Sequence, residues 1–238
     1  MQKVVIGGLL FLSASASAAT MPTGLYGKVG FGQNFGFNKD TTINQSFGGT
    51  SEKFKDHLDF KRSNSYEIAL GYRYPQLSWL TTEVALSYHS KMDMRGKTMV
   101  GSSETYDQPS QTSIKSTTLM FSGQIDLATY FDQDKWLLHP YVGLGVGVSH
   151  NKLEDSRVHY RTSFVRLNTN DSHTDFAWQA KLGVTYAATQ HIVLDLSYAY
   201  NDYGKATSDK ANYLGSTVKL SDIDYRTQEV MLGMRYFF

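Results

Sequence analysis

The sequence predicts an all-β protein: an eight-stranded antiparallel up-and-down transmembrane β-barrel, preceded by a cleavable signal peptide. Three observations predict this fold. Eight segments alternate apolar residues with small or polar residues at a period of two, which is the periodicity of a β-strand. The links between these segments alternate between short and long. The amino terminus has the composition of a secretory signal.

The first residues have the three parts of a signal peptide. A positively charged start precedes an apolar run at 4–12 (VVIGGLLFL) and a stretch of small residues at 13–19. Ala16 and Ala18 make an A-x-A site, so we expect cleavage after Ala18. The apolar run is far shorter than the roughly 20 residues of a membrane-spanning helix; the alternative interpretation is a buried N-terminal helix. The predicted domains are residues 1–18, the signal peptide, and residues 19–238, the barrel.

Each of the eight segments is long enough for a tilted membrane strand, which needs roughly 9–11 residues. In 140–149 (PYVGLGVGVS), Val142, Leu144 and Val146 alternate with glycines, so one face is aliphatic and the other is almost bare backbone. The other segments follow the same rule. The predicted strands are 24–35, 65–74, 79–89, 117–130, 140–149, 175–187, 191–201 and 227–238.

The links predict the order in which the strands are connected. Short links lie near 75–78, 131–135 and 187–190, and long polar links lie at about 36–64, 90–114, 151–173 and 202–222. We expect the long links to be structureless loops, and a compact soluble domain rarely contains four of that length. Short turns on one side and long loops on the other are typical of an outer-membrane barrel.

Aromatic residues gather near both ends of the predicted strands. Rings with an apolar body and a polar edge prefer the headgroup region, so two belts are expected. The group beside the short turns is Tyr74, Trp79, Tyr130, Trp136, Tyr186, Tyr236 and Phe238, and the group toward the long loops is Tyr66, Tyr88, Phe176, Tyr198 and Tyr200.

The glycines of 140–149 fit the inside of a narrow barrel. In lipid, every backbone amide needs a partner within the protein, which only helices and closed barrels provide. An eight-stranded barrel has room only for packed side chains, so Gly143, Gly145 and Gly147 leave space for longer residues from neighbouring strands. A phosphate-binding loop is the alternative, but the later glycine and helix start of such a loop are missing.

The inward face of the predicted strands carries both signs of charge. Buried charges must be paired or neutralised, so we expect a polar network that fills the barrel; a narrow gated conduit is the alternative. The predicted network is Lys28, Glu67, Arg73, Glu83, Asp126, Lys181, Asp195, Glu229 and Arg235.

Enzyme, cofactor and metal signatures do not stand out. The chain has no cysteine and no HExxH, GxSxG or P-loop pattern, and its seven histidines lack metal-ligand spacing. We therefore predict no enzymatic activity, no cofactor and no metal site. Ser87 and His89 share an inward face and resemble a nucleophile with its base, but such chemistry needs a third, positioned group. The net charge of +1 gives no reason to expect a nucleic-acid partner.

Three segments resemble a known family: HPYVGLGVGVSHN (139–151), DFAWQAKLGVTYAATQHIVLDLSYAYNDYG (175–204) and EVMLGMRYFF (229–238). They are similar to small outer-membrane barrels of the OmpA/opacity type, the opacity-like surface antigens of the "porin family". The resemblance covers about 19–238 and implies a Gram-negative outer-membrane barrel with roles from membrane integrity to adhesion. OmpA itself has a periplasmic peptidoglycan-binding domain; this chain stops at the last strand, so wall anchoring is not expected.

The resemblance also implies partners. The alternating residues Leu232, Met234, Tyr236 and Phe238 are similar to the signal that such barrels present to the outer-membrane assembly machinery. Outer-membrane lipid and lipopolysaccharide are expected neighbours, and the long loops are the surface for a host or surface ligand. Lysine and arginine bind phosphates, so the loop residues Lys53, Lys55, Lys61 and Arg62 are candidates to bridge lipopolysaccharide phosphates. Three functions remain open: adhesion or another surface structural role, a narrow channel, and a lipid-modifying enzyme.

Overall fold

The structure is a computed structural model that describes most of the chain after residue 19. The described residues are 20–37, 39–47, 50–100, 104–105, 110–133, 135–160, 163–167, 172–206, 211–213, 216–220 and 223–238; their side chains are described at 20–37, 61–93, 113–133, 135–154, 172–205 and 224–238. The predicted signal peptide lies outside these residues and stays a prediction. Within them, no helix has the length and apolarity to cross a membrane.

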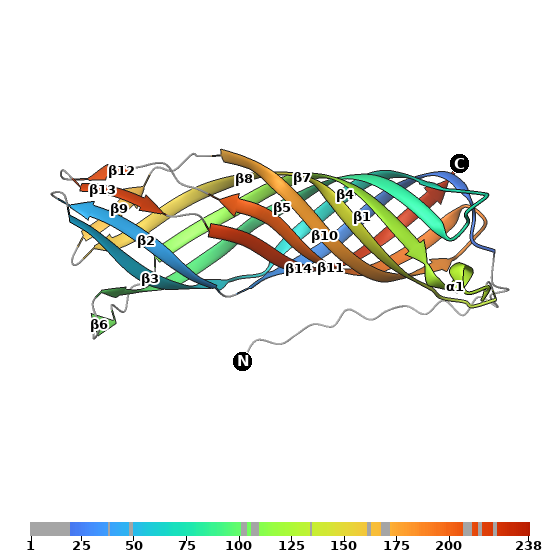
Figure 1. The fold of residues 1–238 in the computed structure, drawn as a ribbon, viewed down its shortest axis with the longest axis horizontal. Helices are drawn as coiled ribbons and strands as arrows, with labels where there is room; N and C mark the ends of the chain where they lie inside the picture. Colours follow the sequence, from blue (N-terminus) through green and yellow to red (C-terminus); the bar gives the residue numbers. More distant parts are fainter. Residues whose placement is uncertain are drawn as a thin grey trace.

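Eight strands close into a ring, which confirms the predicted fold class. Each pairs antiparallel with two neighbours, and the order around the ring follows the order in the chain (Figure 1). The ring strands are β1 (Gly24–Gly36), β4 (Ser63–Arg73), β5 (Leu80–Val100), β7 (Ser110–Asp126), β8 (His139–Tyr160), β10 (Ser172–Ala187), β11 (Ile192–Ala206) and β14 (Ile223–Phe237).

The first and last strands complete the barrel. β1 pairs with β14 from Tyr26 opposite Phe237 to Gly36 opposite Thr227. At the chain end, the Phe238 amide donates a 3.1 Å hydrogen bond to the Leu25 carbonyl. The closure leaves no open sheet edge between the first and last ring strands, which is what a hydrocarbon environment requires of the backbone.

The expectation of structureless long links is wrong, because these links contain further strands. They are β2 (Lys39–Phe47), β3 (Thr50–Phe60), β6 (Glu104–Thr105), β9 (Ser163–Leu167), β12 (Ala211–Tyr213) and β13 (Ser216–Leu220). β3 pairs with the far end of β5, β9 with the far end of β8, and β2 with both β3 and β13. Pairing with the ring strands or with one another satisfies backbone groups of these strands although their composition is polar.

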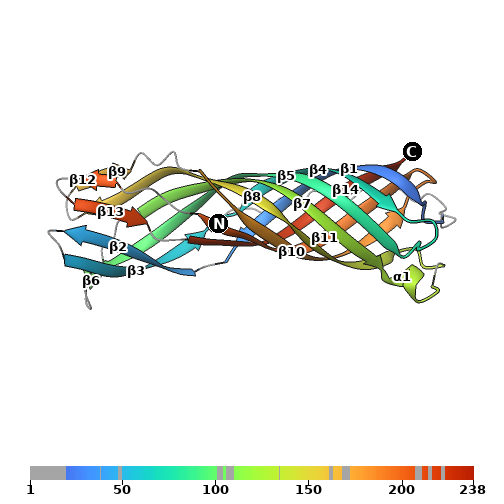
Figure 2. The ribbon, with the colours of Figure 1, turned by 45° about the horizontal axis from the view of Figure 1, so that its top comes forward.

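The added strands lie at one end of the molecule. Figures 1 and 2 show β2, β3, β12 and β13 at the end opposite the carboxyl terminus and helix α1 (Leu127–Tyr130). We call this set of strands, β2, β3, β6, β9, β12 and β13, the outer extension. It continues the walls of the barrel beyond its lipid-facing part.

The strand predicted for 117–130 ends four residues early, because residues 127–130 form helix α1. Asp126 is its N-cap: the Thr129 amide donates a 3.1 Å hydrogen bond to Asp126 Oδ1. Aspartate is among the preferred N-cap residues because its carboxylate satisfies an otherwise unpaired helical amide. The cap therefore turns the chain away from β7 into the link toward β8.

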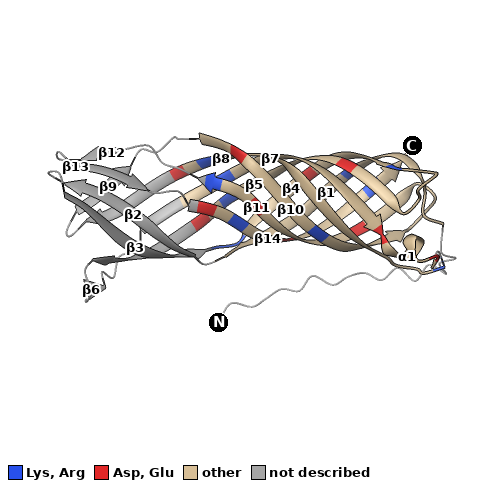
Figure 3. Cartoon of the chain, viewed as in Figure 1, with Lys and Arg blue, Asp and Glu red and all other residues tan. Residues whose placement is uncertain are grey.

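The ring strands expose their apolar side chains and bury their charged ones, the reverse of the arrangement in a soluble barrel. On β4, Ile68 and Leu70 are 59% and 62% exposed, whereas Glu67 and Arg73 are buried. The same alternation runs through the other ring strands; acidic and basic residues lie on neighbouring strands along the barrel in Figure 3, while the exposed side chains of its middle are mainly aliphatic and aromatic. This pattern is the one expected of strands that meet lipid outside and a polar interior inside.

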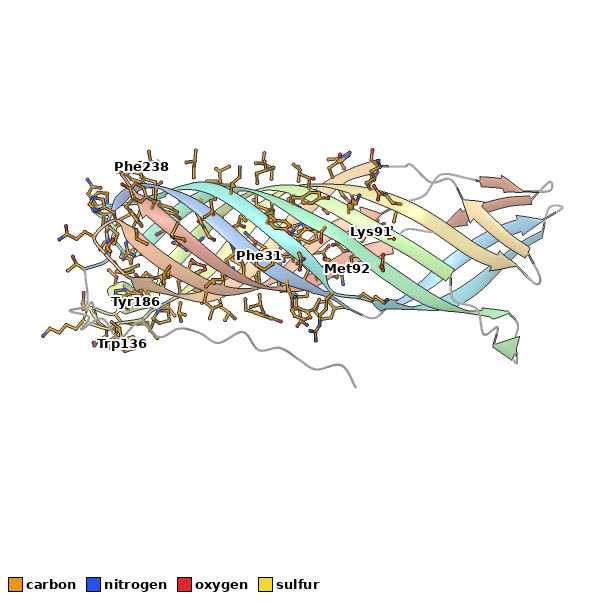
Figure 4. The ribbon with its side chains drawn as sticks, turned by 180° about the vertical axis from the view of Figure 1, so that it is seen from behind. Phe31, Lys91, Met92, Trp136, Tyr186 and Phe238 are labelled. Atoms are coloured by element: carbon orange, nitrogen blue, oxygen red, sulfur yellow. The ribbon has the colours of Figure 1, made fainter. Side chains whose placement is uncertain are left out.

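Exposed aromatic side chains mark two heights on the barrel. Figure 4 shows Trp136, Tyr186 and Phe238 at the end near the short links, with Phe31 farther along the outer surface. Tyr66 lies opposite Phe31 on the next strand, and their rings are 5.5 Å apart. The outer belt contains Phe31, Tyr66, Tyr88, Phe176 and Tyr198, each at least 37% exposed.

Candidate functional site

The middle of the barrel interior contains an ion-paired cluster. Lys28 Nζ lies 2.8 Å from Glu67 Oε1 and 3.7 Å from Glu83 Oε1. The Tyr26 hydroxyl donates a 2.9 Å hydrogen bond to Glu83 Oε2. These residues come from β1, β4 and β5, three neighbouring strands whose register brings their inward positions to the same height. The cluster therefore ties three walls together.

A second cluster adjoins the first, because Arg235 on β14 lies opposite Lys28 on β1. Arg235 Nη2 pairs with Asp195 and donates a 2.9 Å hydrogen bond to Gln124 Oε1. The Tyr141 hydroxyl donates to Asp195 at 3.2 Å. The Arg235 guanidinium also lies 5.3 Å from the centre of the Tyr26 ring and 5.5 Å from that of Tyr141. The Arg235 side chain thus contacts residues on four other strands, β1, β7, β8 and β11.

Glycines make room for these large inward residues. Gly71 lies opposite Tyr26, and Gly183 lies opposite Tyr141. A Cβ atom at either position would collide with the tyrosine ring. Gly145 likewise lies opposite Gln179, whose side chain covers it. The prediction that inward glycines leave space for longer neighbours is confirmed at Gly143 and Gly145, each of which lies against a glutamine side chain, whereas a Cβ atom at Gly147 would first meet the Leu119 carbonyl.

Near the short links, the Asp126 carboxylate binds several donor groups inside the barrel. Asp126 Oδ2 lies 2.9 Å from Arg73 Nη2 and 3.0 Å from His139 Nδ1. Arg73 also donates a 3.0 Å hydrogen bond to the Thr129 hydroxyl in α1. The same aspartate caps α1, so this layer joins the end of the barrel to its adjacent link.

Above the middle cluster, a glutamate bridges two walls. The Ser65 hydroxyl donates to Glu229, and Asn201 Nδ2 donates to Glu229 Oε2 at 3.2 Å. Lys181 is buried on β10 and interacts electrostatically with both Glu67 and Asp195. All nine residues of the predicted network are at most 7% exposed and point inward: Lys28, Glu67, Arg73, Glu83, Asp126, Lys181, Asp195, Glu229 and Arg235.

An aromatic layer beneath the outer extension was not predicted. The Tyr203 hydroxyl lies 2.9 Å from His89 Nε2, and the Tyr203 ring is 5.2 Å from that of Tyr225. All three side chains are at most 2% exposed. Tyr203 continues the inward series of Ala199 and Asn201 at a period of two, so extending the alternation past residue 201 finds it.

Apolar side chains fill the interior at a similar height. Met92, Ile114 and Leu153 are at most 1% exposed and lie side by side on β5, β7 and β8. All three fall in segments that the sequence marks as long links, and an irregularity between His89 and Met92 shifts the alternation of β5. A period of two read from the membrane part therefore misses them.

The Ser87–His89 pair does not form a nucleophile site. The Ser87 hydroxyl donates to Glu67 Oε2 at 3.2 Å, whereas His89 Nε2 bonds the Tyr203 hydroxyl. Each polar atom is therefore held by a different partner. Within the residues that the structure describes, no group of three His, Cys, Asp or Glu side chains is placed to hold a metal ion.

The four residues of the predicted assembly signal all lie on the lipid-facing side of the last strand. Leu232, Met234, Tyr236 and Phe238 are 62%, 43%, 48% and 75% exposed. The Tyr236 and Phe238 rings lie 5.5 Å apart. By contrast, Phe237 points inward and packs on Tyr26.

Comparison with known proteins agrees with this architecture. The family model described as "Outer membrane protein beta-barrel domain" matches residues 4–238. The outer membrane protein PagN of Salmonella typhimurium is 26% identical over 176 residues, which cover 72% of this chain and 71% of PagN. The "Putative adhesin RC1281" of Rickettsia conorii is 23% identical over 170 residues, and the match covers 66% of each chain.

Two solved structures share the fold. The outer membrane protein OprG from Pseudomonas aeruginosa matches with a TM-score of 0.55 and 13% identity, over 92% of this chain and 99% of OprG. Neisserial surface protein A matches with a TM-score of 0.50 and 20% identity, over 91% and 98%. The closed ring, the reversed sides of its strands and the family match lead to one conclusion: this chain belongs to the outer membrane protein β-barrel domain family and is an integral protein of the Gram-negative outer membrane.

Proposed function

We propose that this protein is a surface adhesin, in which a sealed barrel holds the outer extension on the cell surface to bind a host or surface ligand. The length of the ring strands carries the proposal. β5 and β8 contain 21 and 22 residues, against 11 in β4. A tilted membrane strand needs roughly 9–11 residues, so about half of each long strand is available outside the bilayer.

The form of the outer extension suits recognition. Its strands pair with one another and with the far ends of β5 and β8, so they are held on a rigid scaffold. Segments displayed on such a scaffold commonly carry binding function. The match to a protein named as an adhesin, together with the match to PagN, supports the same reading.

The filled interior supports a role as an anchor and not as a catalyst or a channel. Ion pairs, the buried tyrosines and the apolar layer occupy successive heights of the barrel. Ser87 and His89 are bonded to other residues. The partners we propose are outer-membrane lipid and lipopolysaccharide, the assembly machinery that reads the last strand, and a ligand of the outer extension.

Removal of one hairpin tests the adhesive role. Residues 38–61, which include β2 and β3, are replaced by a short Gly-Ser turn, and the protein is displayed on a non-adherent Gram-negative strain. We expect cell binding to be lost while the heat-dependent gel mobility of the barrel is retained. A matched control replaces the short link 131–135 at the opposite end, which should leave binding unchanged. Adhesion that survives loss of 38–61, in a correctly folded barrel, contradicts the proposal.

Planar-bilayer recording tests the sealed interior separately. The proposal predicts no reproducible unitary current from the purified barrel. Reproducible steps whose size changes on Glu83→Ala or Lys181→Ala would show that ions pass through the network, and the channel would then be the better function. For the non-enzymatic reading, overexpression of the wild-type protein and of His89→Ala should yield identical lipid A profiles.

A further inference from the structure

Three lysines lie on neighbouring strands just beyond the outer aromatic belt. Lys91 is on β5, Lys115 on β7 and Lys152 on β8. The register of β7 and β8 places Lys115 directly opposite Lys152. In Figure 4, Lys91 lies farther than Phe31 from the end of the barrel with the short links. Strand register thus brings together lysines that are far apart in the sequence.

The lysine side chains face outward. Lys91 is exposed, and the Lys115 and Lys152 side chains are 35% and 43% exposed. Lys115 Nζ lies 2.9 Å from Glu154 Oε2, and Lys152 Nζ lies 4.0 Å from Glu154 Oε1. Two ammonium groups therefore converge on one carboxylate, although like charges on directly opposed residues repel. The arrangement places two cations within reach of one external group.

An apolar strip lies on the membrane side of these lysines, separated from them by the outward pair Thr117 and His150. On β7 it contains Leu119 and Phe121, and on β8 it contains Val148 and Val146. Leu119 lies opposite Val148 and Phe121 opposite Val146, and all four are 48–55% exposed. At about 3.3 Å per residue, Lys115 lies about 13 Å along β7 from Leu119. The surface is therefore cationic at the outer interface and apolar below it.

We propose that Lys91, Lys115 and Lys152 bind a phosphate group of an outer-leaflet glycolipid whose acyl chains lie on the apolar strip. The proposal rests on the lipopolysaccharide contact in the proposed function and names the residues that make it. Lysine binds phosphate as a compact point charge with three donors. A soluble polyanion would use the lysines alone, whereas an apolar strip that begins beyond the next outward pair, Thr117 and His150, favours an amphiphile. Glu154 holds the two ammonium groups close together before the lipid binds.

These lysines differ from the set that the sequence suggested. The side chains of Lys53 and Lys55 lie outside the described residues. Arg62 stacks over the Phe35 ring at 5.2 Å. The register of β7 and β8, which no local pattern reveals, is what identifies Lys115 and Lys152 as a pair.

Lipid titration of the purified barrel in detergent micelles tests this site. The probes are a bis-phosphorylated, multiply acylated lipid A and the same lipid after enzymatic removal of its phosphates, with binding read by native mass spectrometry. We expect the phosphorylated lipid to bind the wild-type barrel about tenfold more tightly, as one or two charge-assisted contacts would give. Lys115→Gln/Lys152→Gln should abolish that preference. Arg226→Gln, an exposed cation on β14 that pairs with Asp202, is the matched control and should keep it.

The remaining outcomes contradict the proposal in different ways. Equal binding of the dephosphorylated lipid, or an unchanged preference in the double variant, excludes phosphate recognition by this pair. Displacement of the lipid by inorganic phosphate at the same concentration shows a site for a free anion, and displacement by heparin shows a site for a soluble polyanion. Gel mobility verifies that each variant is folded. The adhesion test changes only residues 38–61, and the lipid test changes only Lys115 and Lys152. Either proposal can therefore fail while the other stands.

Discussion

Lys28 on β1 and Glu67 on β4 form a 2.8 Å ion pair inside the barrel, with side chains only 0% and 6% exposed. Glu83 on β5 lies 3.7 Å from the same ammonium. Removing two charges from water is costly, and their attraction offsets this cost only while both partners are present. The pair should therefore matter most when it is broken on one side.

Breaking the pair on one side should destabilise the barrel strongly. Lys28→Met leaves Glu67 buried without its nearest cation, and such changes cost about 3–5 kcal/mol. The double variant Lys28→Met/Glu67→Leu removes both charges and should recover part of that loss. Urea unfolding in phospholipid vesicles measures the free energies, with Lys135→Met in an exposed link as the control. Equal losses in the single and double variants would mean that the pair is not coupled.

Arginine on the lipid-facing side should be costly. Leu144 is 70% exposed in the membrane part of β8, and Val184 lies on the outward face of β10. Leu144→Arg should reduce the free energy of unfolding by about 2–4 kcal/mol, the cost of this charge near the bilayer midplane. Val184→Arg should cost less, because Val184 is two residues from Tyr186 at the short-link end of the barrel. Leu137→Arg, in the link before β8, is the control and should be tolerated. If both arginines are harmless in vesicles, the assignment of the two faces is wrong.

Inward glycines should differ in their tolerance of a side chain. A Cβ atom at Gly145 would meet the Gln179 side chain, which can move, whereas one at Gly147 would meet the Leu119 carbonyl of the neighbouring strand. Gly147→Ser should therefore destabilise the barrel more than Gly145→Ser. The difference arises because a side chain can rotate away from the added atoms, whereas a backbone carbonyl cannot. The same unfolding assay ranks the two variants, and equal midpoints would contradict the packing described for β7 and β8.

The last residue should affect assembly more than stability. Phe238 is 75% exposed and ends the alternating series on β14. Phe238→Ala should lower the amount of folded barrel in the outer membrane, while protein refolded in detergent keeps nearly wild-type stability. Quantitative blotting of unboiled membrane fractions measures the first and urea unfolding the second. Leu182→Ala, another exposed apolar residue, is the control. Normal assembly of Phe238→Ala would remove support for the terminal signal.

The membrane part of the fold could be predicted because its physical rule is local. With a period of two, one outward residue such as Leu144 fixes the side of every neighbour on its strand. The same alternation identifies Lys28, Glu67 and Arg235 as inward residues. The pairs they form depend on the shear between strands, which local sequence does not encode, so the partners Lys28–Glu67 and Arg235–Asp195 came only from the structure.

The outer extension and helix α1 could not be predicted. Outside the bilayer, strands need not alternate apolar outward residues with polar inward ones. The strands of the outer extension are short or rich in polar residues, so in the sequence they look like long polar links. Their pairing partners are also distant in the chain: β2 pairs with β13, more than 160 residues away. At the other end, the Asp126 cap converts the last residues of a predicted strand into a helical turn.

Gel mobility of unboiled and boiled outer-membrane fractions tests the closed barrel most directly. A ring of eight hydrogen-bonded strands resists detergent at room temperature, so unboiled protein should migrate as a compact species and shift to its full mass only after boiling. Identical migration of the two samples, or recovery of the processed chain as a detergent-independent soluble monomer with full sheet content, would contradict a lipid-embedded barrel.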